Sequence, residues 1–238
     1  TEYTQICMLT VEAALYKALV DKGITPDVTA GLSLGEYGAH IASGAMTMED
    51  AFGVVRKRGI YMQEAVPTGG AMTAVLGLDP EKIEEICKET AQKESAVVSI
   101  ANYNCPGQIV ITGQKDAVDK AAAACSEAGA KRAVPLKVSG PFHSKMLEGA
   151  GEKLGEALKD VEIHDIKVPY ITNVTADYVA SKDDVKDYLK RQVSSSVRWQ
   201  QTIERLIADG ADEFIEIGPG RSLAGFMRKI NRDVKVVN

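Results

Sequence analysis

Ser33 lies at the centre of Gly31-Leu32-Ser33-Leu34-Gly35, between a short apolar segment and a helical pattern. A Gly-x-Ser-x-Gly turn from strand to helix strains the serine, and its glycines remove side chains that would collide. The hydroxyl then projects from the start of a helix expected over 34–43, where unpaired N–H groups favour negative charge on an attacked carbonyl oxygen. The pattern indicates a nucleophilic serine with the Leu34 N–H as first oxyanion donor. The alternative is a turn in which Ser33 only caps the helix.

A serine hydroxyl is a weak nucleophile at neutral pH and needs a positioned base, most often histidine. The chain has three histidines. His40 falls roughly two turns after Ser33 on the predicted helix, and His164 lies in a polar stretch that is typical of a surface connection. His143 remains, in the loop 140–144. A loop histidine alone is more often structural, but elimination of the other two favours His143 as the base.

Apolar periodicity predicts the elements that must position these residues. Helices are expected over 5–22, 34–43 and 48–65, and the breaker Pro67-Thr68-Gly69-Gly70 follows. Residues 71–138 then show the order strand, helix, strand, strand, helix, strand, which is the ferredoxin-like split unit. The strands of this unit are expected at 71–78, 96–102, 108–112 and 132–138, and its helices at 80–92 and 115–128.

Helices and strands also alternate after this insert. We therefore predict an α/β fold with a hydrolase-like main domain, residues 1–68 and 139–238, which has a parallel sheet and a nucleophile elbow. A ferredoxin-like small domain, residues 69–138, is inserted into it. The later elements are expected as a helix that begins within 140–144 and runs to 158, helices over 183–192 and 199–208, and strands over 168–174 and 212–217.

Composition restricts the class of protein. The chain has 238 residues, of which 45% are hydrophobic and 26% charged, as in ordinary globular proteins. Its net charge of −5 disfavours nucleic-acid binding, and no apolar run approaches the ~18 residues of a membrane span. The first residues show no secretory signal. Four widely spaced cysteines argue against a metal site and a disulfide framework, and favour a reducing cytoplasm.

Several segments together resemble the malonyl-CoA:acyl carrier protein transacylase family, which is related to polyketide synthase acyltransferase domains. Residues 31–37 resemble its Gly-His-Ser-Leu-Gly-Glu-Tyr motif, and the resemblance covers the whole chain in order. The other matching segments are 55–63 around Arg58, Asn102-Tyr103-Asn104-Cys105-Pro106-Gly107-Gln108 with the strand after it, Gly140-Pro141-Phe142-His143-Ser144, Arg191-Gln192-Val193, Val197-Arg198-Trp199, and Glu216-Ile217-Gly218-Pro219-Gly220.

The resemblance implies a function: ping-pong transfer of a malonyl group from malonyl-CoA to the phosphopantetheine thiol of acyl carrier protein, in fatty acid biosynthesis and without a cofactor. It implies that Ser33 becomes malonylated and that His143 is the base. The remaining site residues follow from the same resemblance: Arg58 holds the substrate carboxylate, the Gln192 backbone carbonyl accepts the His143 N–H, Phe142 limits the space beside the acyl chain, and Asn102 and Gln108 line the cleft.

The sequence departs from the family at two places. Leu32 stands where the family has histidine. The family also begins with an apolar strand and a Gly-Gln-Gly-Ser-Gln loop, whose glutamine supplies a second oxyanion N–H, and this chain starts after that loop. We therefore expect a fragment, or a first segment held separately.

Three alternatives remain open. One is a polyketide-type acyltransferase, and another is a non-catalytic remnant that binds carrier protein. The third is a serine thioesterase or hydrolase, which is disfavoured because its histidine normally follows an acidic residue near the C-terminus, whereas His143 is mid-chain.

Overall fold

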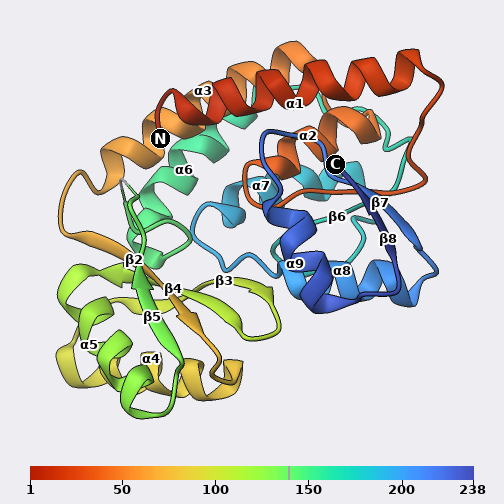
Figure 1. Cartoon of the computed structure of the whole chain (residues 1–238). Helices are drawn as coiled ribbons and strands as arrows, with labels where there is room; N and C mark the ends of the chain where they lie inside the picture. Colours follow the sequence, from red (N-terminus) through yellow and green to blue (C-terminus); the bar gives the residue numbers. More distant parts are fainter. Residues whose placement is uncertain (139) are drawn as a thin grey trace.

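The computed structural model describes residues 1–138 and 140–238. Helices and strands alternate along the chain, and a compact group of strands and helices projects below the rest (Figure 1). The first elements are α1 (Thr4–Asp21), β1 (Thr29–Ala30), α2 (Gly35–Ser43) and α3 (Met48–Ala65). Those after the projecting group are η1 (Lys145–Leu147), α6 (Glu148–Leu158), β6 (Tyr170–Ile171), η2 (Lys182–Asp184), α7 (Val185–Gln192), α8 (Trp199–Ala208), β7 (Glu213–Ile215), α9 (Ser222–Ile230) and β8 (Lys235–Val237).

The projecting group contains one antiparallel sheet with strand order β3-β4-β2-β5. Both of its helices lie on the same face of this sheet, at the bottom of the molecule (Figure 1). The predicted order strand, helix, strand, strand, helix, strand is confirmed. The elements are β2 (Gly70–Leu76), α4 (Pro80–Glu94), β3 (Val98–Cys105), β4 (Gln108–Gln114), α5 (Lys115–Glu127) and β5 (Arg132–Pro135).

Side chains alternate between the two faces of this sheet, as the pleat requires. On β4, Ile109 and Ile111 pack with the buried residues of α4 and α5, whereas Val110 joins a second cluster on the opposite face. Met72 of β2 belongs to that second cluster, and Phe142 packs against it. The face of the sheet opposite α4 and α5 is therefore turned toward the loop that carries His143.

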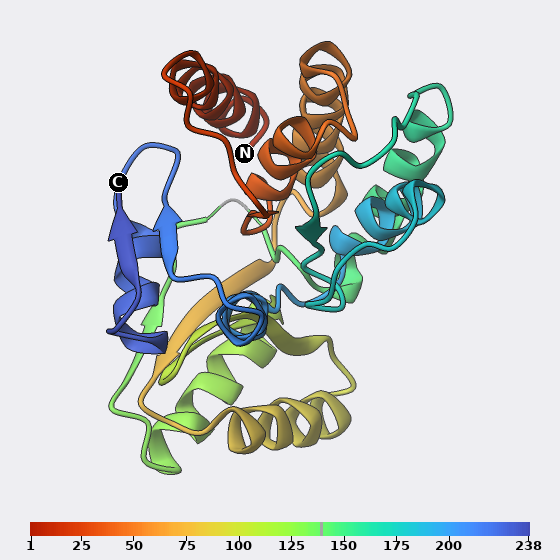
Figure 2. The ribbon, with the colours of Figure 1, turned by 90° about the vertical axis from the view of Figure 1, so that its right-hand side faces the viewer.

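The described strands outside this sheet form two separate parallel pairs, β1 with β6 and β7 with β8. Figure 2 shows the blue β7–β8 pair apart from the teal β6 strand. Parallel sheet elements are thus confirmed, but one continuous parallel sheet is not found among the described residues. Each strand has only two or three residues, and the chain leaves β1 at once through the turn at Gly31.

Some predicted boundaries were wrong. Residues 140–144 are not helical, and the helix that was expected to begin there starts at Glu148 after the short η1. The strand predicted over 168–174 keeps only Tyr170–Ile171, because the following residues turn back and pair Ile171 with Tyr178. Helix α9 and strand β8 were not predicted. The predicted domain boundary at residue 139 lies outside the described residues.

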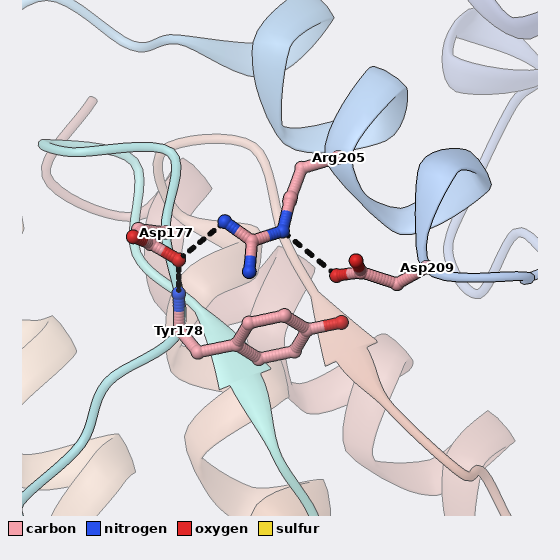
Figure 3. A network of polar contacts seen from close by, with 4 residues as sticks. All are labelled: Asp177, Tyr178, Arg205 and Asp209. Atoms are coloured by element: carbon pink, nitrogen blue, oxygen red, sulfur yellow. Dashed lines mark hydrogen bonds and ion pairs between the residues drawn. The ribbon is translucent and has the colours of Figure 1, made fainter.

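The turn after β6 is held against α8 by Arg205. Its guanidinium donates to Asp209 at 2.8 Å and to Asp177 at 3.0 Å, and it lies 5.2 Å from the centre of the Tyr178 ring (Figure 3). These side chains are partly exposed, so each ion pair by itself contributes little to stability. Together they fix a turn whose inner residues reach the site described below.

Among the residues described, none of the helices combines the length and apolarity needed to cross a bilayer.

The two glycines around Ser33 differ in how strictly they are required. A Cβ atom added to Gly31 would lie 2.0 Å from the carbonyl carbon and oxygen of Gly35, whereas one added to Gly35 would meet no heavy atom within 4 Å. The prediction that both glycines remove collisions therefore holds for Gly31 only. The turn therefore requires glycine at position 31, where its backbone approaches the backbone of Gly35 at the start of α2.

We expect Gly31→Ala to lower the free energy of unfolding by at least about 2 kcal/mol, because backbone atoms must move to admit the methyl group. Gly35→Ala is the matched control, and should change stability by less than about 1 kcal/mol because alanine is the better helix former. Urea unfolding of both variants is the measurement. Equal stability of the two would contradict the steric argument.

Candidate active site

A cleft of about 330 Å³ lies between the face of the β3-β4-β2-β5 sheet opposite α4 and α5 and the starts of α1 and α2. It contains the serine and the histidine that the sequence analysis singled out. The residues that line it are Thr1, Gln5, Leu32, Ser33, Leu34, Arg58, Met62, Met72, Asn102, Leu136, Val138, Phe142 and His143.

Ser33 stands in the turn from β1 to α2 with a φ of 54°. A residue with a side chain rarely adopts this left-handed conformation, which carries a cost of about 1–3 kcal/mol. The strain presents the hydroxyl to the cleft, where Ser33 Oγ lies 2.7 Å from His143 Nε2. The serine and the histidine, 110 positions apart, are thus in direct hydrogen-bond contact.

The tautomer of His143 follows from its partners. Its Nδ1 lies 2.9 Å from the carbonyl oxygen of Gln192 and 3.1 Å from that of Ser195. Carbonyl oxygens only accept hydrogen bonds, so Nδ1 carries the proton and Nε2 is free to accept one from the Ser33 hydroxyl. Burial lowers the pKa of His143 to about 4, and the nearby positive charge of Arg58 acts in the same direction. The imidazole is therefore neutral at pH 7 and able to act as a base.

Arg58 is buried because it lies on the core-facing side of α3, in register with Val54 and Met62. Its Nη2 donates to Ser33 Oγ at 3.2 Å and to Gln192 Oε1 at 3.0 Å, and its Nη1 donates to Gln5 Oε1 at 2.5 Å. Only 1% of the residue is exposed. Burial lowers the pKa of Arg58, while the negative charge of ionised Tyr37 and Glu36 would raise it.

All three hydrogen-bond acceptors of Arg58 in the described residues are neutral. A buried guanidinium without an ion-pair partner favours an anionic ligand, and its planar fork matches a carboxylate. The position of this group beside Ser33 Oγ therefore suits a substrate that carries a carboxylate close to the reacting carbonyl.

The structure brings most of the other candidate residues to the same place. Leu34, Asn102 and Phe142 line the cleft, and Gln192 contributes its carbonyl oxygen to His143. Gln108 does not line this cleft. It lies at the hairpin end of β4, opposite Leu76 and Cys105, and accepts a hydrogen bond from Lys229 of α9 at 3.2 Å.

The other two histidines are placed as the sequence analysis expected. His40 is fully buried, its ring lies 4.5 Å from that of Tyr170, and burial lowers its pKa to about 3. His164 is partly exposed and lies 3.7 Å from the carboxylate of Glu162. Neither of them lines the cleft that contains Ser33.

Sequence reasoning missed three polar residues at the site. Gln5 binds Arg58, and Glu36 and Asn173 form hydrogen bonds directly behind Ser33. Glu36 was visible as the sixth residue of the motif that begins at Gly31, but no chemistry pointed to it. Asn173 fell inside a predicted strand, so its side chain was not considered.

Comparison with known proteins places this geometry in a family. The acyl transferase domain family matches residues 1–236. The malonyl CoA-acyl carrier protein transacylase of Bacillus subtilis (strain 168) is 48% identical over 238 residues, which cover all of this chain and 75% of that protein. The chain belongs to the malonyl CoA-acyl carrier protein transacylase family. The resemblance noted in the sequence is thereby confirmed.

Solved structures of the family agree with this assignment. An acyl carrier protein S-malonyltransferase from Vibrio cholerae has a TM-score of 0.96 at 40% identity, over 100% of this chain and 78% of that one. The transacylase from Streptococcus pneumoniae has a TM-score of 0.95 at 47% identity, over 99% and 77%. A malonyl-transacylase solved in complex with a type II polyketide acyl-carrier protein has a TM-score of 0.96 at 40% identity, over 99% and 76%.

Proposed function

We propose that this transacylase-family chain is an [acyl-carrier-protein] S-malonyltransferase, which moves a malonyl group from malonyl-CoA to the phosphopantetheine thiol of acyl carrier protein in fatty acid biosynthesis. The observation that carries the proposal is the Ser33–His143 hydrogen bond beside the buried Arg58, within one cleft. The 48% identity to the transacylase of B. subtilis supports the choice of substrates.

The first half of the reaction acylates Ser33. Its Oγ attacks the thioester carbonyl carbon while His143 Nε2 takes the hydroxyl proton. The Leu34 N–H is the oxyanion donor, because the Ser33 N–H already donates to Asn173 Oδ1 at 2.6 Å. The carbon–sulfur bond then breaks, His143 returns the proton to the sulfur of the departing CoA, and a malonyl-serine ester remains.

The second half reverses these steps with a different thiol. The phosphopantetheine thiol gives its proton to His143 Nε2 and attacks the ester carbonyl. The bond between carbon and Ser33 Oγ breaks, and His143 returns the proton to the serine. No water is consumed and no cofactor takes part. The two backbone carbonyls on Nδ1 keep the histidine in the required tautomer throughout.

Arg58 sets the acyl specificity in this proposal. When substrate binds, Nη1 uses its second N–H and Nη2 exchanges its hydrogen bond to Ser33 Oγ, so that both groups donate in parallel to the free carboxylate of the malonyl group. The space beside the acyl chain is limited by Phe142, which lines the cleft and packs against the sheet. Asn102 is a further wall of the substrate site.

The finer description of the fold belongs to the same proposal. The left-handed Ser33 between β1 and α2 supports a nucleophile elbow in a hydrolase-like main domain. The strand order β3-β4-β2-β5 with both helices on one face supports a ferredoxin-like insert. We assign the main domain to residues 1–68 and 139–238 and the insert to 69–138. We propose a cytoplasmic location, which four free cysteines favour.

Intact-mass measurement after incubation with malonyl-CoA tests the proposed function. We expect a stable malonyl adduct that disappears when carrier protein with its phosphopantetheine arm is added, as the carrier gains the same mass. Release of malonate without carrier would indicate a hydrolase instead. Carrier binding without an adduct would indicate a non-catalytic remnant.

A polyketide-type acyltransferase is the second candidate, and one observation favours it. A structural neighbour at 40% identity was solved with a type II polyketide carrier protein. Transfer from the malonyl-enzyme to fatty-acid and polyketide carriers, measured side by side, separates the two. Faster transfer to the fatty-acid carrier is the expected result.

As the pH is lowered, the acylation rate should begin to fall at a lower pH than it would if His143 had the ordinary pKa of histidine. The neutral form of His143 is active, and its pKa is lowered from 6.5 to about 4. As the pH falls, the base is therefore lost only through pH 4 rather than through pH 6.5. Single-turnover acylation between about pH 4 and 8 is the measurement. A midpoint near the ordinary histidine value would contradict the buried, neutral base.

A further inference from the structure

Asn173 is a fully buried residue in the turn after β6, and it neither transfers a proton nor contacts the acyl group in the reaction described above. Its side-chain amide contacts both arms of the turn that presents Ser33. The Oδ1 atom accepts the Ser33 N–H at 2.6 Å, and the Nδ2 group donates to the Gly31 carbonyl at 2.6 Å. One amide thus joins the residues on either side of Leu32.

These two hydrogen bonds act where the backbone is least stable. Ser33 has the left-handed φ of 54°, which the chain adopts only if the surroundings hold it there. Without Asn173, the Ser33 N–H and the Gly31 carbonyl would lose these buried partners. The strained turn would then relax, and Ser33 Oγ would move away from His143 Nε2.

Glu36 fixes Asn173 relative to the other half of the site. Its buried Oε2 atom accepts the backbone N–H of Asn173 at 3.1 Å and the Nε2 of Gln192 at 2.6 Å. The same Gln192 group donates to the Ser33 carbonyl at 3.0 Å, and the Gln192 backbone carbonyl accepts from His143. The carboxylate therefore ties the serine turn to the segment that orients the base.

The backbone of Asn173 is itself held in place. Its carbonyl accepts the Arg198 N–H at 3.1 Å, and the neighbouring Thr172 N–H donates to the Asp177 carbonyl at 3.2 Å. On the outer side, Arg205 binds Asp177 (Figure 3). The side-chain amide of Asn173 therefore extends toward the serine turn from a backbone that is itself held in place.

We propose that Asn173, anchored by Glu36, is a positioning residue for acyl transfer: it holds the Gly31–Ser33 turn in the conformation that brings Ser33 Oγ to His143 Nε2. The inference deepens the proposed function and rests on it. Asn173 acts through Ser33 and lies outside the set of residues that line the cleft.

Asn173→Ala should slow acylation of Ser33 at saturating malonyl-CoA by about 10²-fold, because a shift of ~1 Å in a reacting atom costs that much. The malonyl-CoA concentration for half-maximal rate should change by less than about threefold, because no hydrogen bond joins Asn173 to Arg58 in the described residues. Asn173→Asp keeps the acceptor for the Ser33 N–H and loses the donor to Gly31, so its loss should be intermediate.

Ser43→Ala is the control for loss of a buried hydrogen bond away from the site. The Ser43 hydroxyl is buried at the end of α2 and donates to the His40 carbonyl at 3.0 Å. This variant should acylate at the wild-type rate even if its melting temperature falls as far as that of Asn173→Ala. A folded Asn173→Ala that acylates within about threefold of wild type, or slows only as much as Ser43→Ala, would overturn the proposal.

Glu36 provides a second pair of variants, which tests the positioning role if Asn173→Ala does not fold. Both hydrogen bonds are accepted by Glu36 Oε2, so Glu36→Gln can place its carbonyl oxygen at the Oε2 position and keep them. Glu36→Gln should stay within several-fold of wild type, whereas Glu36→Ala should lose at least about tenfold. Equal loss in both variants would count against a positioning role.

Failure of the inference can be told apart from failure of the proposed function. If the wild type takes no malonyl group, the proposed function fails. Labelling of Ser33 by a fluorophosphonate probe then still measures how the hydroxyl is presented. Wild type should label much faster than Asn173→Ala, and equal labelling would overturn the inference whatever the acyl donor is.

Discussion

Ser33→Ala should form no malonyl adduct, and His143→Ala should form it about 10⁴-fold more slowly than wild type at pH 7. The first variant lacks the atom that is acylated. The second leaves the Ser33 hydroxyl without the acceptor that lies 2.7 Å away, so that attack requires a neutral alcohol without a base. The measurement is the rate of adduct formation by intact mass after rapid mixing with excess malonyl-CoA.

His164→Ala is the matched control for this pair. His164 is partly exposed, lies on the connection from α6 to β6, and does not line the cleft. It should acylate at the wild-type rate. Circular dichroism and melting temperature should show that His143→Ala is folded. Near-normal acylation of a folded His143→Ala would exclude this imidazole as the base.

The positions of Ser33 and His143 could be predicted because each depends on local sequence. Gly31 and the strand-to-helix pattern around Ser33 specify a tight turn, and the chain has few histidines from which to choose the base. Long, regular helices such as α1 and α3 were predicted nearly to the residue, because their apolar faces repeat over several turns. The distance between serine and base, however, came only from the structure.

The errors concern residues whose roles are set by distant contacts. Asn173 was read as part of a strand, but the chain turns back after Ile171, and its side chain reaches Ser33, 140 positions earlier. Gln108 matched a family motif, yet the hairpin places it beside Lys229 instead of the cleft. Strand β8 was missed because its three residues are too few for a clear alternation.

The burial of Arg58 shows how one residue can be ambiguous in sequence and decisive in structure. Arg56, Lys57 and Arg58 read as three cations on a solvated helix face, and the helical period alone decides which of them points inward. Lys57 is exposed and Arg58 is not. A guanidinium buried among neutral acceptors beside the nucleophile is costly unless the substrate supplies the charge it lacks.

Arg58→Ala should therefore lower kcat/KM for malonyl-CoA by about 10²–10³-fold or more, while kcat/KM for acetyl-CoA is unchanged or higher. Leaving a buried charge unpaired costs about 3–5 kcal/mol. In wild type this cost applies when acetyl-CoA binds, but not when malonyl-CoA binds. At ~1.4 kcal/mol for each factor of ten, the cost corresponds to a hundredfold to several-thousandfold preference for malonyl-CoA over acetyl-CoA. Removal of the guanidinium should therefore slow malonyl transfer without slowing acetyl transfer, and the preference for malonyl-CoA should be lost.

The comparison of two donors separates specificity from general damage. Arg58 also donates to Ser33 Oγ and to Gln192, so its loss could disturb the nucleophile itself, and that disturbance would slow both donors alike. Lys57→Ala, one residue away on the exposed side of α3, should keep the wild-type ratio of malonyl to acetyl transfer. Arg58→Lys should recover little of that ratio, because an ammonium group cannot present two parallel donors to a carboxylate. If Arg58→Ala lost malonyl and acetyl transfer equally, the buried guanidinium would serve the geometry of Ser33 and not the choice of acyl group.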